Sequence, residues 1–389
     1  MLLNKIVVPI LLGITLFGME FDEFYMQALK NSPYLQSNAL GIDAAKMDAS
    51  IETRYKNPTL QLEYSQFDAN YGGSDDGHRV ALSQPVRLWG VGDTRVLVAN
   101  GLQREAKSSL VLTKALFSKR LHSLYVEYKK NLQLFNLAVV DKEIAKRVYE
   151  ISKERYDNGA IAKVDVIQAR LDYKLSQAKQ KDAEILKLQS YYDLLAYAGL
   201  NEEVDIEVDY RETLLHVEKQ SNPLFAFYHS KEDLAHAKEQ LYKNRLEWVD
   251  VYAEYEKEPN DDIYRIGLSI PIALFNTKKE ERQKARLEAK RTELLAENTN
   301  RFLKIKLKAL AKQRILQKKL IKQLEDALGD GTELLELFEE GYRIANIDIV
   351  QLQQVKAALI KTKASLIEAK ANLELNIIET NYLQGKYND

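Results

Sequence analysis

Cysteine is absent from the 389-residue chain, and proline occurs only seven times. Without cysteine the chain has no disulfide, no thiolate metal site and no cysteine nucleophile. So few prolines favour long, uninterrupted helices. Neither sign of charge is in excess, because 56 Lys and Arg nearly balance 57 Asp and Glu. The net charge therefore gives no argument for a polyanionic partner such as nucleic acid.

A long hydrophobic run is also missing. The most apolar segment is residues 6–17, whereas a membrane-spanning helix needs about 20 apolar residues. One basic residue, Lys5, precedes this segment, which is typical of a secretory signal peptide. We therefore expect residues 1–19 to be a signal peptide, with a buried N-terminal helix as the alternative. If the protein enters a membrane, we expect it to do so with β-strands.

Two motifs recur at the same distance of 186 residues. LSQPVRLWG begins at Leu82 and LSIPIALFN begins at Leu268, and both contain Leu-Ser-x-Pro. YDNGAIAKVDV begins at Tyr156, and YRIANIDIVQL begins at Tyr342. Two matches at one offset indicate an internal duplication. We divide the chain into a signal peptide, 1–19, a first repeat, 20–200, an acidic linker or equatorial segment, 201–221, and a second repeat, 222–389.

Each repeat predicts a helix, a β-hairpin and a long helical hairpin. Apolar and polar residues alternate in TLQLEYSQF and HRVALSQP, and again in WVDVYAEYE and YRIGLSIP, which predicts four strands with one apolar face each. The β-hairpins are expected at about 58–88 and 248–274, with Pro58, Pro85 and Pro271 at strand ends. Apolar residues at heptad spacing predict long helical hairpins at about 91–198 and 277–387. The two β-hairpins either cap a helical bundle or form part of a barrel. A barrel would need several chains, because four strands are too few to close one.

The sequence contains no enzyme motif: no phosphate-binding loop, no H-E-x-x-H and no nucleophile elbow. The pair Asp75–Asp76 is interpreted as solvated turn residues rather than as two catalytic acids. Five scattered His predict no metal site. The basic run at 301–322 is interleaved with apolar residues at helical spacing, so we interpret it as a solvated helix face and not as a nucleic-acid surface. We expect no catalytic activity, no cofactor and no bound metal.

The order of these elements, their duplication, and a Tyr-x-x-Gly turn leading into Val-Asp-Val resemble the TolC-type outer membrane efflux proteins. NPTLQLE followed by LSQPVRLWG adds to the likeness, which covers about residues 20–385. The resemblance implies a mainly α protein with a small antiparallel β part. It also implies a homotrimer, in which four strands per chain close a 12-stranded trimeric β-barrel above a trimeric α-barrel of helical hairpins.

The resemblance further implies a passive outer membrane channel of a tripartite efflux system in a Gram-negative-type cell. The helical barrel would lie in the periplasm, and the partners would be a periplasmic adaptor (a membrane fusion protein), an inner-membrane pump and outer membrane lipid. NPTLQLEYSQF and LSQPVRLWGVGDTRVLVA are most similar to the heavy-metal efflux branch. Drug export and type I protein secretion stay open as alternatives. A periplasmic coiled-coil adaptor or structural protein is an alternative of a different class.

The resemblance places the two Tyr motifs at periplasmic turns, where the tunnel narrows to a closed aperture. Tyr156 and Gly159 mark the outer turn, and Ala345 and Asn346 mark the inner turn. Glycine adopts positive φ at little cost, which suits Gly159 to a chain reversal. Asparagine also tolerates that conformation, so Asn346 is expected to serve beside Ala345.

In the family's gate a Tyr and an Arg of the inner hairpin grip an Asp of the neighbouring outer hairpin. By position the Tyr is Tyr342 and the Asp is Asp165, but the Arg position holds Ile347. Two further positions, which hold Asp rings in the well-studied channel, are Gln351 and Gln354. We hypothesise a tip closed by amide and Tyr hydrogen bonds, with weaker cation block than an Asp-ringed channel. Alternatively, Gln351 and Gln354 are ordinary polar positions of a coiled coil.

Overall fold

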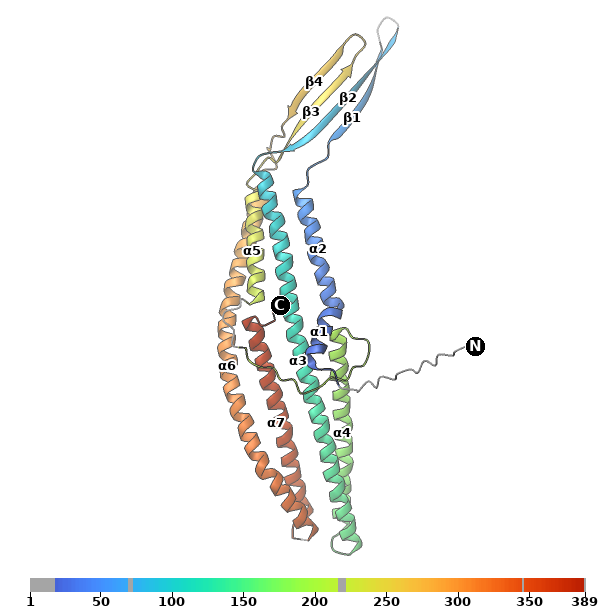
Figure 1. Ribbon diagram of the computed structural model, residues 1–389, viewed down its shortest axis with the longest axis vertical. Coiled ribbons are helices and arrows are strands. Elements are labelled where there is room, and N and C mark those ends of the chain that lie inside the picture. The colour runs from blue at the N-terminus through green and yellow to red at the C-terminus, as the bar shows by residue number, and fades with distance from the viewer. Residues whose placement is uncertain (1–17, 69–72, 216–221, 345, 388–389) are drawn as a thin grey trace, which may run out of the picture. The chain divides into compact units, whose positions relative to one another are not determined.

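Four antiparallel strands and two pairs of long helices make up most of the chain (Figure 1). The computed structural model describes residues 18–68, 73–215, 222–344 and 346–387. Residues 1–17 of the expected signal peptide therefore lie outside the described residues. The helices are α1 (Phe21–Asn31), α2 (Pro33–Thr53), α3 (Val91–Asp157), α4 (Lys163–Ala198), α5 (Pro223–Leu241), α6 (Lys279–Arg343) and α7 (Ile349–Gln384). The strands are β1 (Thr59–Asp68), β2 (Ser74–Arg87), β3 (Trp248–Lys257) and β4 (Asp262–Ser269).

The helices begin and end where the local sequence allows it. No proline interrupts α3 or α6, which run for 67 and 65 residues. Helix α4 ends at Ala198 and is followed by Gly199, whose φ of +74° is the left-handed conformation that glycine adopts readily. At the start of α5 the side-chain oxygen of Asn222 accepts a hydrogen bond from the Leu224 N–H at 2.9 Å, and Pro223 takes the first helical position.

The chain forms two compact units that combine segments from both repeats. Unit 1 consists of residues 1–33, 117–215 and 310–380, and unit 2 consists of residues 34–116, 216–309 and 381–389. Helices α3 and α6 each contribute to both units. The two compact units therefore do not coincide with the two predicted repeats. The repeats are defined by similar sequence motifs, whereas the units are defined by contacts in the folded chain.

The four strands form one antiparallel sheet in unit 2, in the order β1-β2-β3-β4. The central pairing joins the two repeats, because β2 of the first pairs with β3 of the second over ten residue pairs from His78–Lys257 to Arg87–Trp248. Within the described residues β1 and β4 each have a partner strand on one side only. The mainly α fold with a small antiparallel sheet of four strands per chain is confirmed.

The two faces of the sheet differ in chemistry. Alternate residues on one face are large, apolar and exposed, with 70% of Leu62 and 87% of Ile266 accessible to solvent. Residues of the other face, such as Glu63, Arg79 and Glu254, form ion pairs across the strands. The sheet is therefore amphipathic, and its apolar face has no cover within the described part of the chain.

Strand β2 is longer at both ends than the sequence indicates. Asp75 and Asp76 belong to the strand and pair with Phe67 and Gln66, so the expectation that they lie in the turn was wrong. Pro85 lies inside the strand, opposite Asp250 of β3, and does not end it. Since β1 pairs with β2 only as far as Ser83, Pro85 has a neighbouring strand on one side, where a missing N–H is tolerated. Residues 69–72, where the sequence predicts a turn, lie outside the described residues.

A close helix contact stabilises the helical part of unit 2. The buried residues Val91, Val98, Leu234 and Leu241 bring α3 and α5 together. Gly101 of α3 makes this approach possible, because a Cβ there would lie 2.9 Å from Leu234 Cδ1 and 3.2 Å from its Cα. A larger side chain would force the two helices apart.

Unit 1 buries a core that draws on all four long helices. Val148 of α3, Ala169 of α4, Leu335 of α6 and Leu352 of α7 are among its buried residues. The described part of the acidic linker also belongs to this unit, where Met19 N–H donates to Asp205 O at 2.7 Å. In the described residues, no helix has a stretch that is long and apolar enough to cross a membrane.

Candidate gate at the helix turns

The turn between α3 and α4 is closed by backbone hydrogen bonds around Gly159. Gly159 has a φ of +75°, and its N–H donates to Tyr156 O at 2.8 Å. The next N–H, of Ala160, donates to Arg155 O at 2.8 Å. The carboxylate of Asp165 accepts from the Ala162 N–H at 3.2 Å and so caps the first turn of α4. In this chain Asp165 is thus a capping residue, and its pairing with a neighbouring subunit stays a prediction.

The turn between α6 and α7 closes on Gly341. Its carbonyl oxygen accepts from the N–H groups of Asn346 at 2.9 Å and Ile347 at 3.2 Å. The Ile347 side chain folds onto the same glycine, where a Cβ would lie 2.5 Å from Ile347 Cδ1. The side chain that stands at the expected Arg position therefore braces the turn by packing. Ala345 lies outside the described residues, and Asp348 accepts from the Gln351 N–H at 2.9 Å to cap α7.

The two duplicated tyrosines have different environments. Tyr156 is 41% exposed, whereas Tyr342 is 1% exposed inside the core of unit 1. The Tyr342 hydroxyl lies 2.7 Å from Ser152 Oγ. The Ser152 hydroxyl donates its proton to the Val148 carbonyl oxygen, with an Oγ–O distance of 2.7 Å. The Tyr342 hydroxyl is therefore the donor in its hydrogen bond with Ser152. Burial raises the pKa of Tyr342, which keeps the phenol neutral.

Arg155 connects the outer turn to the inner one, a role that the sequence alone did not suggest. Its Nη1 donates to Tyr342 O at 2.6 Å, and its guanidinium carbon lies 4.7 Å from the centre of the Tyr342 ring. Arg155 and Gly341 occupy equivalent positions, 186 residues apart, in the two repeats. The repeat alignment was the only available signal, because it sets an Arg against a Gly beside the two Tyr motifs.

The amides near the tip split into a bonded pair and an exposed pair. Gln351 and Gln354, the two predicted gate amides, are exposed. The hydrogen bond between side-chain amides is instead formed by Gln168 of α4, whose Nε2 donates to Gln353 Oε1 of α7 at 2.9 Å. Gln351 and Gln354 are thus available to face neighbouring subunits, and their role in an aperture stays a prediction.

A buried lysine links α7 to both helices of the first hairpin. Lys356 is 5% exposed, and its Nζ lies 2.6 Å from Asp172 Oδ2 on α4 and 3.1 Å from Asp141 Oδ1 on α3. A second such link joins Lys129 of α3 to Glu374 of α7 at 2.6 Å. Charges removed from water are stable only when paired, so these contacts fix the register of the helices against each other.

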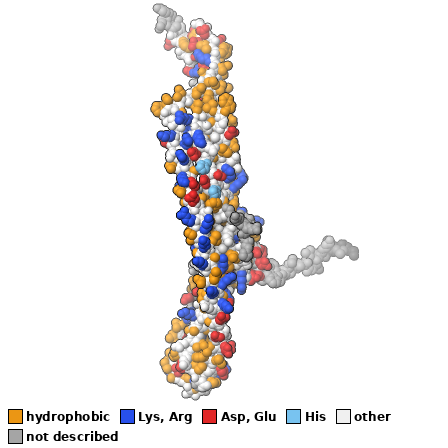
Figure 2. Space-filling model, turned by 90° about the vertical axis from the view of Figure 1, so that its left-hand side faces the viewer, with side chains coloured by type: hydrophobic (Ala, Val, Ile, Leu, Met, Phe, Trp, Pro, Cys, Tyr) orange, Lys and Arg blue, Asp and Glu red, His pale blue; other side chains and the backbone are white. Residues whose placement is uncertain are grey.

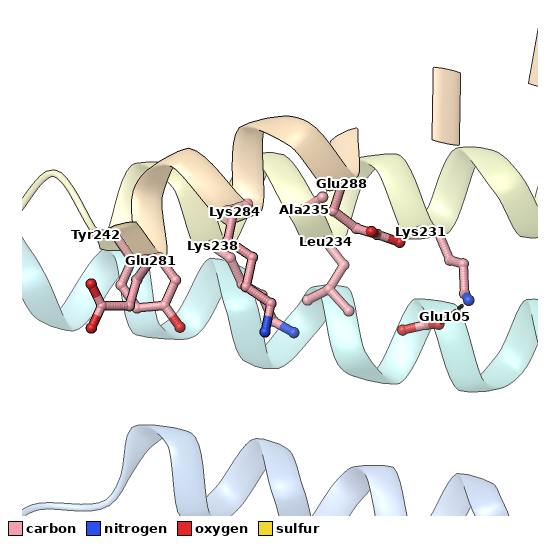
Figure 3. A pocket seen from close by; sticks show the side chains of 10 residues that line it. Glu105, Lys231, Leu234, Ala235, Lys238, Tyr242, Glu281, Lys284 and Glu288 are labelled. Atoms are coloured by element: carbon pink, nitrogen blue, oxygen red, sulfur yellow. Dashed lines mark ion pairs between the residues drawn. The ribbon is translucent and has the colours of Figure 1, made fainter. Parts of the chain in front are cut away.

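Other parts of the chain offer little chemistry. A hollow of about 330 Å³ lies among α3, α5 and α6 of unit 2 (Figure 3). Leu234 points into it, Lys238 and Lys284 lie side by side, and Lys231 pairs with Glu105 at 3.7 Å. Three acids balance three lysines in its lining, and no serine, threonine or cysteine is among the lining residues, so we interpret it as a groove between packed helices.

The remaining sequence predictions concern metal binding, the prolines at strand ends and the basic run of α6. In the described ranges no three His, Asp or Glu side chains are placed to hold a metal ion. Pro58 directly precedes β1 and Pro271 follows β4 by two residues, whereas Pro85 lies within β2 as described above. The basic run on α6 is exposed at Lys304 and Lys319, and Figure 2 shows Lys and Arg side chains spread between hydrophobic ones on the face of the molecule that carries this helix.

Comparisons with known proteins found one family model and several solved structures of similar fold. The family model described as outer membrane efflux protein matches residues 24–200. The outer-membrane channel OprN has a TM-score of 0.80 and 13% identity, covering 95% of this chain and 90% of its own. The outer membrane protein VceC of Vibrio cholerae has a TM-score of 0.77 and 13% identity, and the match covers 94% of this chain and 95% of VceC. The CmeC outer membrane channel of Campylobacter jejuni has a TM-score of 0.76 and 13% identity, and the match covers 94% of this chain and 85% of CmeC. No curated protein sequence matches the chain.

At such identities the solved structures establish a common fold, and the family model adds the sequence relationship. Channels of this family lie in the outer membranes of Gram-negative bacteria, are trimeric, and work with adaptors and inner-membrane pumps. They are conduits and not enzymes. The sequence match relates residues 24–200 to the outer membrane efflux proteins, and over nearly its whole length the chain shares the fold of solved outer-membrane channels such as OprN.

Proposed function

We propose that this chain is the subunit of a homotrimeric outer membrane channel that serves as the passive exit of a tripartite efflux system. The observation that supports this most strongly is the sheet. Its apolar face is exposed, as at Leu62 and Ile266, and its edge strands β1 and β4 each lack a partner on one side in the described chain. Three copies would pair these edges and place the apolar face outwards. No backbone N–H or C=O group would then face lipid without a hydrogen-bond partner.

The edge strands carry charges that favour this closure. Glu63 on β1 and Arg265 on β4 lie on the polar face and have opposite signs. When β4 of one subunit pairs with β1 of the next, these opposite charges lie on the same face of the closed sheet. Cross-strand pairs of opposite charge stabilise a sheet, whereas like charges destabilise it.

We further propose that the two helix turns form the closed end of the channel. In each subunit Arg155 and Ser152 hold Tyr342, and Lys356 holds α7 against the first hairpin. Gln351 and Gln354 would face the pore axis, with Asp165 and Ile347 at the contacts between subunits. Opening then requires the inner hairpin to leave the hydrogen bonds of Tyr342, because this residue joins the two turns.

For the cargo we propose heavy-metal cations, from the likeness of NPTLQLEYSQF and LSQPVRLWGVGDTRVLVA to that branch of the family. Cells that lack the channel would then accumulate cobalt, zinc, cadmium or copper and regain export when it is restored. Restored export of organic drugs or of a secreted protein, without any effect on metal ions, would assign the channel to one of those classes instead.

The proposed division of the chain has its own test. Residues 1–19 form the signal peptide, 20–200 and 222–389 form the repeats, and 201–221 form the linker. Determining the N-terminal sequence of the mature protein checks the first boundary, and a start near residue 20 is expected. For the function as a whole, trimer size and bilayer conductance are decisive, since a periplasmic adaptor would be stripped from membranes by carbonate and would not conduct.

A further inference from the structure

Five charged side chains form a continuous band across the polar face of the sheet. Arg79 of β2 pairs with Glu63 of β1 at 3.2 Å and also with Glu254 of β3. Arg265 of β4 pairs with Glu254 and with Glu256. Every strand therefore contributes to what we call the charge band: Glu63, Arg79, Glu254, Glu256 and Arg265.

Glu254 is the centre of the charge band. Its side chain is 4% exposed and holds both guanidinium groups. A hollow of about 500 Å³ lies over the band and exposes its remaining charges to solvent. The opposite face of the same strands carries Leu62, Val80 and Ile266. In a lipid-embedded closed sheet that apolar face points outwards, so the charge band points into the lumen.

The charge band has an excess of negative charge. Three carboxylates face two guanidiniums, which leaves one negative charge per chain. By strand alternation Asp75 and Asp250 lie on the same face, while Arg87 at its base pairs with Glu247 at 3.6 Å. The one lysine in the four described strands, Lys257, does not lie on this face, because it pairs with His78 on the apolar side. Three chains would thus surround the lumen with a negative potential.

The two gate amides that are proposed to face the pore axis contrast with the charge band, because Gln351 and Gln354 carry no charge. We propose that this channel selects for cations at the charge band in the sheet and not at the helix turns. The inference rests on the proposed function, since it needs three chains to close the sheet. Within the band Glu63 and Glu256 are the selecting carboxylates, and Glu254 is a positioning residue that holds Arg79 and Arg265 away from the lumen axis.

Reversal potentials in planar bilayers under a potassium chloride gradient test this proposal. The trimeric wild-type channel is expected to prefer cations, and the preference should weaken in high salt, which screens exposed charges. The double variant Glu63→Gln with Glu256→Gln should move the permeability ratio toward one, and Arg79→Gln should increase the cation preference. Asp76 lies on the same strand as Arg79 but on the opposite face of the sheet. Asp76→Asn is therefore the matched control and should leave the permeability ratio unchanged.

The outcomes separate the proposal from the function on which it rests. A wild-type protein that neither forms trimers nor conducts overturns both. A conducting trimer whose permeability ratio is unaffected by the band variants overturns the charge band alone, as does a ratio that responds equally to Asp76→Asn. If the band variants fail to assemble, the salt dependence of the wild-type ratio still decides, because a salt-independent ratio contradicts selection by exposed charges.

Discussion

At the scale of single residues, Tyr342 is the point where the two helix turns meet. Its hydroxyl donates to Ser152, its carbonyl oxygen accepts from Arg155, and its ring lies under the Arg155 guanidinium. Ile347 stands where the resemblance places an Arg, and in the structure an Arg from the other hairpin of the same chain, Arg155, contacts Tyr342 instead. The contact is thus made within one subunit, independently of any contact between subunits.

Two conservative variants at this contact should differ in cost. Tyr342→Phe leaves Ser152 bonded to Val148, so the free energy of unfolding should fall by only about 1 kcal/mol. Ser152→Ala leaves the Tyr342 hydroxyl buried without an acceptor, which should cost about 1–3 kcal/mol. Thermal unfolding midpoints of the detergent-solubilised trimer measure the difference. Equal midpoints for the two variants would refute the assignment of the Tyr342 hydroxyl as the donor.

The exposed amides Gln351 and Gln354 carry the prediction about cation block. Replacing both by Asp should raise block by divalent cations, because six carboxylates crowded by threefold symmetry bind cations, whereas six amides do not. Single-channel recordings with added divalent ions measure the block. The double Asn variant keeps the amides and serves as the control. Unchanged block in the Asp variant would favour the alternative that both residues are ordinary polar positions of a coiled coil.

At the scale of elements, buried charges join segments that lie far apart in the sequence. Lys356 joins α7 to α3 and α4 through Asp141 and Asp172. Glu247, just before β3, is bound by Arg95 of α3 at 2.7 Å and lies 3.6 Å from Arg87 at the end of β2. These contacts set the positions of the helices in unit 1 and of the sheet on its supporting helices in unit 2.

Lys356→Met should destabilise the protein strongly. It leaves Asp141 and Asp172 facing each other without their shared cation, and breaking a buried ion pair costs about 3–5 kcal/mol. The exposed Lys361, on the same helix, provides Lys361→Met as the control. Replacing both Asp by Leu in the Lys356→Met background should restore much of the loss. A thermal midpoint of Lys356→Met that matches the control would contradict the structural role.

Glu247 predicts a loss of stability in acid. Burial alone would raise the pKa of Glu247, but the hydrogen bonds and charge of Arg95, with Lys278 and Arg87 nearby, outweigh burial and lower it. A carboxylate with a lowered pKa stabilises the fold above its unfolded pKa of about 4.3, and this contribution disappears as the pH falls through the folded value.

Thermal midpoints measured between neutral pH and pH 3 test this effect. The wild-type midpoint should fall more steeply below about pH 4.3 than that of Glu247→Gln, whose side chain does not titrate. Glu297→Gln, an exposed change on α6, should follow the wild-type curve. Parallel curves for wild type and Glu247→Gln would show that the carboxylate does not contribute.

The sequence was sufficient for the elements but not for their contacts. Alternation in TLQLEYSQF and the duplication at 186 residues predicted the strands and helical hairpins, because period and repetition are local properties. Pro85 and Asp75 were misplaced, since pairing with β1 and β3 overrides the local turn signals. The contacts of Arg155 with Tyr342 and of Lys356 with Asp172 join residues more than 180 positions apart, and no local pattern indicates them.

At the scale of the whole molecule, the exposed features of one chain support the proposal that it assembles with further copies. The sheet has two edge strands and an exposed apolar face, and the helix turns expose the amides that are proposed to line the pore. Three copies around one axis, as we propose, would satisfy each of these features. Solved outer-membrane channels such as OprN share the fold, and the two edge strands of this chain carry charges of opposite sign on the polar face of the sheet.

The most direct test of the central claim combines assembly and conduction in one preparation. The protein is extracted from outer membranes in mild detergent, its mass is measured by light scattering, and the same fraction is added to a planar bilayer. We predict a trimer that resists carbonate extraction and produces discrete conductance steps. A carbonate-soluble monomer that leaves the bilayer silent would contradict the proposal that this chain forms an outer membrane channel.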